Sequence, residues 1–358
     1  MAFQIKSTNV ISDTTGANNI NGFTFTSATR DGTGGVFSLG TSVFQGTVSG
    51  YSVGGGGPAA FSDNIEKYSF VSDANGTSVG NLTMGRYTSG TAASTVSGYS
   101  VAGAAPFAHI SYEKFPFATD ANAKGVGKLA VRRWRPYGGS SSSTHGYTGG
   151  GQGDEVTPAQ VLASVTIEKF PFSSDVDSQL VGILTYGTAQ LNTGHSSPIS
   201  GYAFFCGPPN AFAGIQKFQF ATDSTATTLV TSSTVVPNRS YGQGAGMSSL
   251  TFGYASGTAY PGTPAPFGVS NQVKMIEKFS FATDGACSAV GQLTQARYGA
   301  GASSSTVSGY THGGYGGSPV VTVTIIDKFP FSTDTNATAV GQLVTAREEQ
   351  AGANARTL

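Results

Sequence analysis

The chain has 358 residues, enough for one large β domain or for two to three ordinary domains. Glycine is abundant, with 51 residues, whereas charged residues make up only 11% and the net charge is zero. The 38% hydrophobic share includes 23 Phe and 15 Tyr, which supply the apolar surface of a folded core. No basic tail, acidic run or long apolar stretch is present, so nucleic acid binding and membrane insertion are not expected.

The first expected strands are FQIKSTNVIS, residues 3–12, and INGFTF, residues 20–25. The second is a weak copy of a phrase that returns six times, with start-to-start spacings of 45, 47, 55, 48, 61 and 50 residues. Such a recurrence predicts a repeat protein. The six copies are IEKYSF (65–70), YEKFPF (112–117), IEKFPF (167–172), IQKFQF (215–220), IEKFSF (276–281) and IDKFPF (326–331).

The residues around each phrase are equally regular. A Ser/Thr-rich run closing in Gly-Tyr precedes it, and V-G-x-L follows it, ending in most copies in an arginine such as Arg86, Arg297 or Arg347. β-branched and aromatic residues between glycine clusters favour strands, and the two aromatics of each phrase point to one strand face because they are two residues apart. No window keeps helical periodicity over three turns. Each unit of about fifty residues therefore predicts four short strands, as in a propeller blade.

The order of these segments resembles the kelch family of β-propellers. In the last unit, ARYGAGASSSTVSGYTHGG, then IIDKFPF, then VGQLVTAR follow the kelch order of an Arg-led inner strand, a strand ending in two glycines, a third strand and a final Arg. The sequence departs from the kelch pattern in lacking a tryptophan in each blade, since Trp134 is the single one, and in having Phe-Pro-Phe in place of a Tyr-Asp pair. The resemblance covers nearly the whole chain and implies a propeller.

The number of blades follows from counting segments. Six Gly-Tyr units are complete, but the Phe-x-Phe segment occurs seven times. Because closing a ring removes exposed strand edges, a strand from residues 1–25 is expected to pair with the residues after Arg347. The sequence therefore predicts an all-β fold: one propeller domain over residues 1–358, with seven four-stranded blades of which the last is composite. Six blades with an N-terminal extension is the alternative.

Charged side chains recur at fixed places in the repeat. A catalytic group is needed once, whereas a group present in every blade serves the architecture, so we expect these residues to tie strands or neighbouring blades together. The four histidines, His109, His145, His195 and His312, show no metal-ligand spacing and are expected in solvated loops or in a pocket. No catalytic residue, cofactor or metal site is predicted. The recurring residues are Lys67, Lys114, Lys169, Lys217, Lys278, Lys328, Arg86, Arg133, Arg239, Arg297, Arg347, Asp73, Asp120, Asp175, Asp223, Asp284 and Asp334.

The loop between the Gly-Tyr segment and the E-K-F phrase varies most from one unit to the next. Because propellers present such loops on a face, they are the predicted contact surface for a protein or glycan partner. Two of them are rich in aromatic residues and prolines. The predicted binding residues are Phe205, Pro208, Phe212, Tyr260, Pro264 and Phe267.

A second resemblance concerns the role of the protein. The opening AFQIKSTNVISDTTGANNINGFTF is similar to the start of many tailed-phage structural proteins, and the EKFPFATD and G-Q-L-T-x-A-R repeats resemble proteins encoded by marine phages. This implies a non-enzymatic virion component: a tail or capsid-associated appendage or adhesin, acting as a homo-oligomer or docked on other virion proteins, and binding a host-surface glycan or protein. The low charge suits a protein held in an assembly. The alternatives are a free carbohydrate- or protein-binding propeller and a propeller hydrolase or oxidase.

Overall fold

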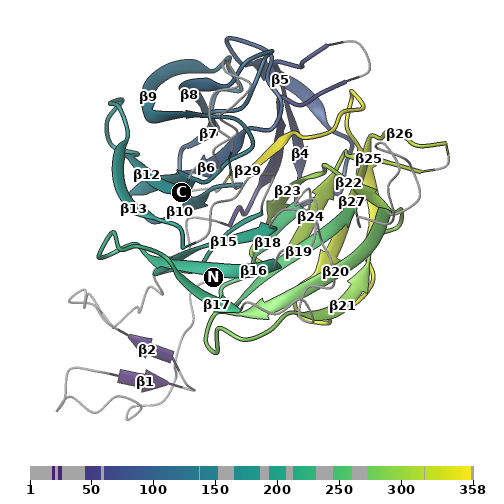
Figure 1. Ribbon diagram of the computed structural model, residues 1–358. Helices are drawn as coiled ribbons and strands as arrows, with labels where there is room; N and C mark the ends of the chain where they lie inside the picture. Colours follow the sequence, from purple (N-terminus) through teal and green to yellow (C-terminus); the bar gives the residue numbers. More distant parts are fainter. Residues whose placement is uncertain are drawn as a thin grey trace, which may run out of the picture. The chain divides into compact units, whose positions relative to one another are not determined.

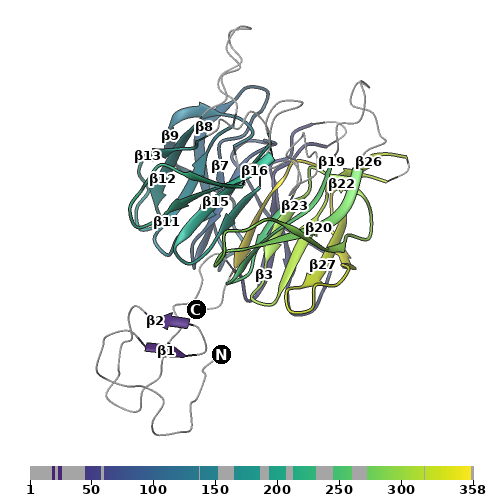
Figure 2. The same cartoon turned by 60° about the horizontal axis from the view of Figure 1, so that its bottom comes forward.

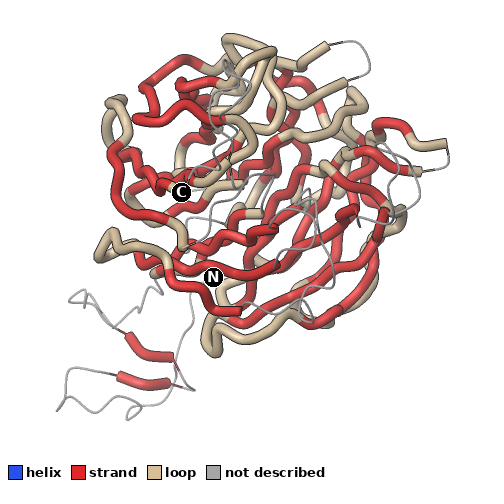
Figure 3. The backbone as a smooth tube through the Cα atoms, viewed as in Figure 1, coloured by secondary structure: helices blue, strands red, loops and turns tan. Residues whose placement is uncertain are grey.

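Figure 1 shows a computed structural model of the chain, which divides into two compact units, Met1–Ser42 and Val43–Leu358. In the first unit, β1 (Asn18–Ile20) and β2 (Phe23–Phe25) pair as an antiparallel hairpin. The described residues form strands and loops without a helix (Figure 3), so none of them forms a helix that could cross a membrane. The described residues are 18–20, 23–25, 45–57, 60–136, 138–151, 165–185, 193–206, 213–230, 245–259, 272–317 and 319–355.

In the second unit, the described residues form six four-stranded antiparallel sheets. Five of them follow chain order from the first strand to the fourth, except that β25 and β26 interrupt the last. The first two contain β6 (Gly90–Ala93), β7 (Ser97–Val101), β8 (His109–Pro116) and β9 (Lys124–Arg133), then β10 (Ser140–Ser141), β11 (His145–Gly149), β12 (Thr166–Pro171) and β13 (Gln179–Ile183). The third contains β14 (Gly194–Ser196), β15 (Ser200–Cys206), β16 (Ala213–Gln219) and β17 (Thr227–Val230).

The remaining chain-order sheets contain β18 (Ala245–Ser248), β19 (Phe252–Ala259), β20 (Gln272–Ser280) and β21 (Ser288–Gln292), then β23 (Gly301–Ser304), β24 (Ser308–His312), β27 (Ile325–Pro330) and β28 (Thr338–Gln342). A small three-stranded sheet joins β22 (Arg297–Tyr298), β25 (Tyr315–Gly316) and β26 (Val321–Thr322). The E-K-F phrase lies in the third strand of all six sheets, which confirms its predicted equivalence between units.

The sixth sheet joins residues from both ends of the second unit. It contains β29 (Ala351–Ala355), β3 (Ser49–Val53), β4 (Asn64–Ser69) and β5 (Thr77–Asn81), and it places Ala353 of β29 opposite Tyr51 of β3. The predicted composite closing sheet paired the residues after Arg347 with a strand from residues 1–25; among the described residues, the strand after Arg347 pairs with residues 49–53. The first Gly-Tyr unit has no inner strand of its own among the described residues, so β29 takes that place. The predicted seven blades are not confirmed.

The six sheets lie in a closed circle (Figures 1 and 2). Each first strand contacts the first strand of the next sheet, in the order β6, β10, β14, β18, β23 and β29, and β29 contacts β6 again. The first strands are therefore innermost, and each sheet covers the face of its neighbour. This is a β-propeller-like architecture.

Aromatic contacts repeat identically within and between sheets. In each Gly-Tyr pair, the glycine makes room for the first aromatic ring of the E-K-F phrase in the same sheet: a Cβ on Gly98 would lie 2.2 Å from Phe115 Cζ. The tyrosine stacks on the second aromatic of the next sheet, with centroids 4.6–5.2 Å apart and interplanar angles of 23–30°. The six stacks are Tyr51–Phe117, Tyr99–Phe172, Tyr147–Phe220, Tyr202–Phe281, Tyr254–Phe331 and Tyr310–Phe70.

A ring of ion pairs also joins every sheet to the next, as the recurring lysines and aspartates predicted. Five of the six aspartates hold φ values of 46–50°, a left-handed turn conformation that Asp tolerates better than most residues. The pairs are partly exposed, so each contributes little alone. They are Lys67–Asp120, Lys114–Asp175, Lys169–Asp223, Lys217–Asp284, Lys278–Asp334 and Lys328–Asp73.

The recurring arginine makes the buried counterpart of these pairs. It ends or follows the fourth strand of one sheet and binds the acidic residue of the E-K-F phrase in the next, with both side chains at most 1% exposed. Arg86 also donates to the carbonyl oxygen of Ala102, and Glu113 accepts the backbone N–H of Thr83 at 2.7 Å. The described pairs are Arg86–Glu113, Arg133–Glu168, Arg297–Asp327 and Arg347–Glu66. The fifth recurring arginine, Arg239, lies outside the described residues.

One repeat lacks both charges of this pair. Its sequence has Thr188 in the arginine position and Gln216 in the acidic position. The amide oxygen of Gln216 accepts the N–H of Thr185 at 2.5 Å, the same hydrogen bond that Glu113 accepts from Thr83. A buried carboxylate without its arginine would be costly, so the neutral amide keeps the hydrogen bond and avoids the charge.

Deleting residues 348–358 is expected to lower the melting temperature by about 10 °C or more, because the closing sheet loses its inner strand and several backbone hydrogen bonds worth ~1 kcal/mol each. Differential scanning calorimetry measures this shift. Deleting only residues 356–358 leaves β29 intact and serves as the control. Equal melting temperatures for the two deletions would contradict the closure by β29.

Replacing Glu113 by Gln is expected to destabilise the fold by about 3–5 kcal/mol, because the fully buried Arg86 keeps its charge without a counter-ion. The matched change Asp120→Asn breaks a partly exposed pair with Lys67 and should cost at most about 1 kcal/mol. Urea unfolding of both variants gives the two values. A Glu113→Gln protein as stable as Asp120→Asn would rule out the structural role of the buried pair.

Candidate functional site at the mouth of the central channel

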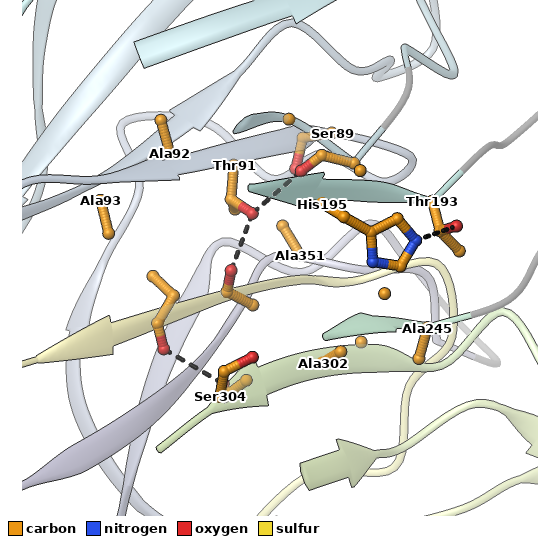
Figure 4. A pocket seen from close by; sticks show the side chains of 18 of the residues that line it. Ser89, Thr91, Ala92, Ala93, Thr193, His195, Ala245, Ala302, Ser304 and Ala351 are labelled. Carbon is orange, nitrogen blue, oxygen red and sulfur yellow. Dashed lines mark hydrogen bonds between the residues drawn. The ribbon is translucent and has the colours of Figure 1, made fainter. Parts of the chain in front are cut away.

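The innermost strands enclose a narrow channel along the centre of the circle of sheets. Its cavity has a volume of about 130 Å³, and its walls are mostly Gly, Ala, Ser and Thr, with His195, Pro136, Glu349, Gln350 and Asn354. Figure 4 shows the short side chains of Thr91, Ala92, Ser304 and Ala351 on these strands, with His195 beside Thr193. The inner strands all run from one end of the channel to the other in the same direction, so their first residues surround one end and their last residues the opposite end.

Serine hydroxyls tie adjacent inner strands together. Ala93 N–H donates to Ser141 Oγ at 3.0 Å, Ser141 N–H to Ser196 Oγ at 2.9 Å, and Ser196 N–H to Ser248 Oγ at 3.1 Å. The chain of bonds continues from Ser248 N–H to Ser304 Oγ, and from Ser304 N–H to the amide oxygen of Asn354. The hydroxyl of each serine thus accepts a hydrogen bond from one neighbouring inner strand, and its backbone N–H donates a hydrogen bond to the inner strand on the other side. These bonds fix the width of the channel.

Close backbone contacts explain the glycines at the start of β14 and at the second residue of β29. A Cβ on Gly352 would lie 1.7 Å from the carbonyl oxygen of Ala302, and one on Gly194 would lie 2.0 Å from that of Gly139. Adjacent inner strands therefore approach more closely here than any side chain permits. The result is a narrow, rigid entrance.

The far end of the channel is covered by Gln45. The side chain is buried, and its amide nitrogen donates to the carbonyl oxygens of Ser248 and Ser305 at 3.2 and 3.1 Å. The next residue, Gly46, donates its N–H to the carbonyl oxygen of Ser304. These acceptors lie at or just beyond the last residues of β18 and β23, so this segment covers the end opposite to the first residues of the strands. We call the other end the mouth.

Two histidines near the channel are fully buried. His195 Nδ1 lies 2.9 Å from the Met247 carbonyl oxygen, which only accepts, so this nitrogen carries the proton and Nε2 accepts from the Thr193 hydroxyl at 3.0 Å. Burial lowers the pKa of His195 to about 4, and burial together with Arg347 lowers that of His312 to about 3. Both rings are therefore neutral at pH 7. The histidines were expected in solvated loops or in a pocket. This expectation is wrong for His312, which is buried within the protein. His195 lines the channel and is also buried.

The mouth is built from the turns that follow the recurring arginines. The residue two positions after the arginine has a left-handed φ in each described turn: Thr88, Arg135, Gly299 and Glu349 have φ values of 55, 52, 63 and 54°. Neighbouring turns are hydrogen-bonded, because Thr88 N–H donates to the Glu349 carbonyl at 2.8 Å and Glu349 N–H donates to Gly299 at 2.6 Å. The repeat therefore places one variable residue per turn around the same opening.

These positions carry the charge that distinguishes the mouth from the channel wall. Arg135 Nη2 lies 4.0 Å from Glu349 Oε1, and neighbouring Glu348 adds a second carboxyl group. Burial raises the pKa of Glu349 to about 7, with Arg135 opposing and Glu348 adding to the shift, and burial also raises that of Glu348. Burial and Glu348 raise the pKa of Tyr298 to about 12, so its hydroxyl stays protonated at neutral pH. Among its described residues, the mouth holds two carboxyl groups and one guanidinium.

Aromatic rings gather beside this charged group. Phe61 and Tyr87 stack with centroids 4.8 Å apart and planes within 7°, and Tyr87 meets Trp134 edge-on at 6.5 Å. The guanidinium carbon of Arg135 lies 4.2 Å from the Trp134 ring centre. Phe61 keeps 43% of its surface exposed, which is unusual for a large apolar side chain. We call Phe61, Tyr87 and Trp134 the aromatic group.

Several buried polar atoms at the mouth have no hydrogen-bond partner among the described residues. Thr88 is 1% exposed and Gln350 is 5% exposed, and both line the cavity. Buried polar atoms are nearly always satisfied, so such a set indicates water or a ligand at the mouth. The atoms are Thr88 Oγ1, Ser89 Oγ, Gln350 Oε1, Trp134 Nε1 and Arg135 Nε.

Of the binding residues predicted from the sequence, one lies in a described strand. Phe205 lies in β15, where its backbone pairs with Gly214. The other five lie outside the described residues: Pro208, Phe212, Tyr260, Pro264 and Phe267. The mouth residues were not predicted from the sequence. Their position, two residues after the arginine, holds Thr, Arg, Gly and Glu in the described units, so it shows no recurring residue type. Within the described ranges, no three His, Cys, Asp or Glu side chains form a metal-binding group.

Comparison with known proteins adds a fold but no family. No family model matches the chain, and no curated protein matches its sequence. Among solved structures, the chain is similar to one described as the structure of YjhT, with a TM-score of 0.59 and 12% sequence identity over 84% of this chain and 99% of that one. At this identity the likeness concerns the fold alone, and it agrees with the propeller-like arrangement of sheets.

The raised pKa of Glu349 predicts a pH-dependent stability. Between about pH 4.5 and 7, the folded protein holds a proton on Glu349 that the unfolded chain releases, so the free energy of unfolding falls as the pH rises, by about 3 kcal/mol in total for this group. Replacing Glu349 by Gln removes this contribution. Urea unfolding across pH 4.5–8 should show the difference between wild type and Glu349→Gln changing through this window. A difference that is independent of pH would exclude the buried, protonated carboxyl group.

Proposed function

We propose that the protein is a non-enzymatic structural and binding component of a phage virion, a tail or capsid-associated appendage or adhesin. We further propose a six-bladed ring of kelch-like units, with no blade contributed by residues 1–42. The observation that carries the proposal is that the recurring reactive groups are engaged in the architecture. All six lysines of the E-K-F phrase pair with the aspartate of the next sheet.

The physical properties of the ring support this role. Buried arginine–carboxylate pairs and aromatic stacks join neighbouring sheets, so the turns and loops at the faces are held on a rigid frame. Such a frame suits the display of loops toward a partner. Charged residues make up only 11% of the chain and the net charge is zero, so little electrostatic repulsion keeps copies apart. We propose that the working form is a homo-oligomer or a subunit docked on other virion proteins, with a host-surface glycan or protein as its target.

A free binding module is the second candidate. It is favoured by the unpartnered buried polar atoms at the mouth, which indicate a ligand and require no virion. Both candidates are binding proteins, and they differ in whether the protein is part of a particle.

Mass spectrometry of purified virions tests the first candidate. We expect the chain to be present in a fixed ratio to the other virion proteins after density-gradient purification. Light scattering on the purified chain should show an oligomer, or a map of the particle should show a docked copy burying at least about 1,000 Å². A stable monomer that is absent from virions would leave only the free binding module.

A further inference from the structure

We propose that the mouth of the channel binds one uncharged saccharide unit, which packs against the aromatic group and forms hydrogen bonds with Glu349 and Arg135. This inference deepens the proposed binding function and rests on it. Four features of the mouth support it: its size, its mixture of donors and acceptors, its exposed ring surface and its charge.

The size of the cavity limits the ligand. At about 130 Å³ it is smaller than the roughly 300–1,000 Å³ of pockets that enclose drug-sized molecules. The serine bonds and close glycine contacts keep the inner strands together, and Gln45 covers the far end. A ligand therefore sits in the mouth and cannot pass through. One sugar ring with its substituents suits this space, and an extended oligosaccharide would have to continue outside it.

The polar groups at the mouth both donate and accept. The carboxyl group of Glu349 accepts and, when protonated, also donates; the guanidinium of Arg135 donates, and the hydroxyls of Thr88 and Ser89 do both. Gln350 Oε1 adds an acceptor that has no partner in the described structure. Sugar hydroxyl groups likewise donate and accept. A ligand with several adjacent hydroxyl groups can therefore satisfy this mixed set, whereas an apolar ligand would leave it unsatisfied at a cost of about 1–3 kcal/mol per buried group.

The aromatic group lies beside Arg135, outside the residues that line the cavity, and we propose that it supplies an apolar face to the part of a sugar ring that projects from the mouth. Phe61 uses one face to stack on Tyr87 and keeps 43% of its surface exposed. Trp134 lies at the edge of Tyr87 and directly under Arg135. Aromatic rings of this kind combine a large apolar surface with a polar edge, which suits a ligand that has an apolar C–H face and polar hydroxyl groups.

The charge of the mouth selects among saccharides. Among the described residues of the mouth, Arg135 lies 4.0 Å from Glu349, and Glu348 is next to Glu349 in the chain, so these residues together are net negative when both carboxyl groups are ionised. A carboxylated, sulfated or phosphorylated sugar would bring like charge to a buried site, which is unfavourable. We therefore expect uncharged hexosides or N-acetylhexosaminides to bind more tightly than their anionic derivatives.

Tryptophan fluorescence tests the inference directly, because Trp134 is the only tryptophan in the chain. The full-length protein is titrated with methyl glycosides of the common uncharged hexoses and N-acetylhexosamines, with glucuronic and sialic acid glycosides as anionic counterparts. We expect a saturable fluorescence change with at least one uncharged glycoside. The apparent affinity for the anionic glycosides should be at least tenfold lower. The variant Glu349→Gln should bind the uncharged glycoside with an affinity at least tenfold lower than that of wild type.

Matched variants separate binding from folding. Asp120→Asn breaks an ion pair away from the mouth and should bind the glycoside like wild type. Thermal melting of Glu349→Gln confirms that the variant folds, and Phe61→Ala offers a second change on an exposed side chain. No saturable change with any glycoside would overturn the inference, as would a response to tetramethylammonium alone, which would indicate a cation site.

The inference and the proposed function fail separately. A protein found in virions that binds no glycoside at the mouth refutes the saccharide site and leaves the structural role. A protein absent from virions that binds a glycoside in a Glu349-dependent manner refutes the virion role and keeps the saccharide site.

Discussion

Each sheet in this protein is too small to bury its own faces, and this constraint governs the rest of the structure. Four short strands rich in Gly, Ser and Tyr have a core only where the next sheet covers them, so the sheets must follow one another until the last meets the first. The repeated contacts all serve that requirement. The tyrosine of one sheet stacks on the phenylalanine of the next, and the buried arginine reaches across to the next acidic residue.

The same constraint explains where the sequence reasoning succeeded and where it failed. The repeat predicted the four strands, the equivalence of the E-K-F phrases and the charged ties, because these depend on local pattern and on recurrence. It did not predict that β29 pairs with β3, since the residue pattern predicts which segments form strands but does not specify which strand edge a terminal segment pairs with. The prediction of seven blades, which is not confirmed, counted the weak copy INGFTF, which carries the aromatic pattern but no Gly-Tyr partner.

The mouth could not be predicted from the sequence, for a different reason. Glu349, Arg135 and Thr88 are far apart in the chain and belong to no motif, and only the circle of sheets brings their turns to one opening. What repeats is the turn, with its left-handed residue, and not the side chain. The repeated residues form the circle of sheets, and the residues that differ between units determine what the mouth can bind. The paired loss of charge at Thr188 and Gln216 is a departure of another kind, since it keeps the frame intact by removing two charges together.

The pairing of β29 with β3 joins residues about 300 positions apart, as Ala353 and Tyr51 show. Until that pairing forms, the inner edge of β3 is open, with a row of unpaired backbone groups that any suitable strand can occupy. In a concentrated solution, the β29 strand of a second copy is chemically identical to the chain's own. Two molecules could exchange these strands and form an interlocked dimer with every native hydrogen bond retained, so the step that completes one ring is also the step at which two rings can become linked.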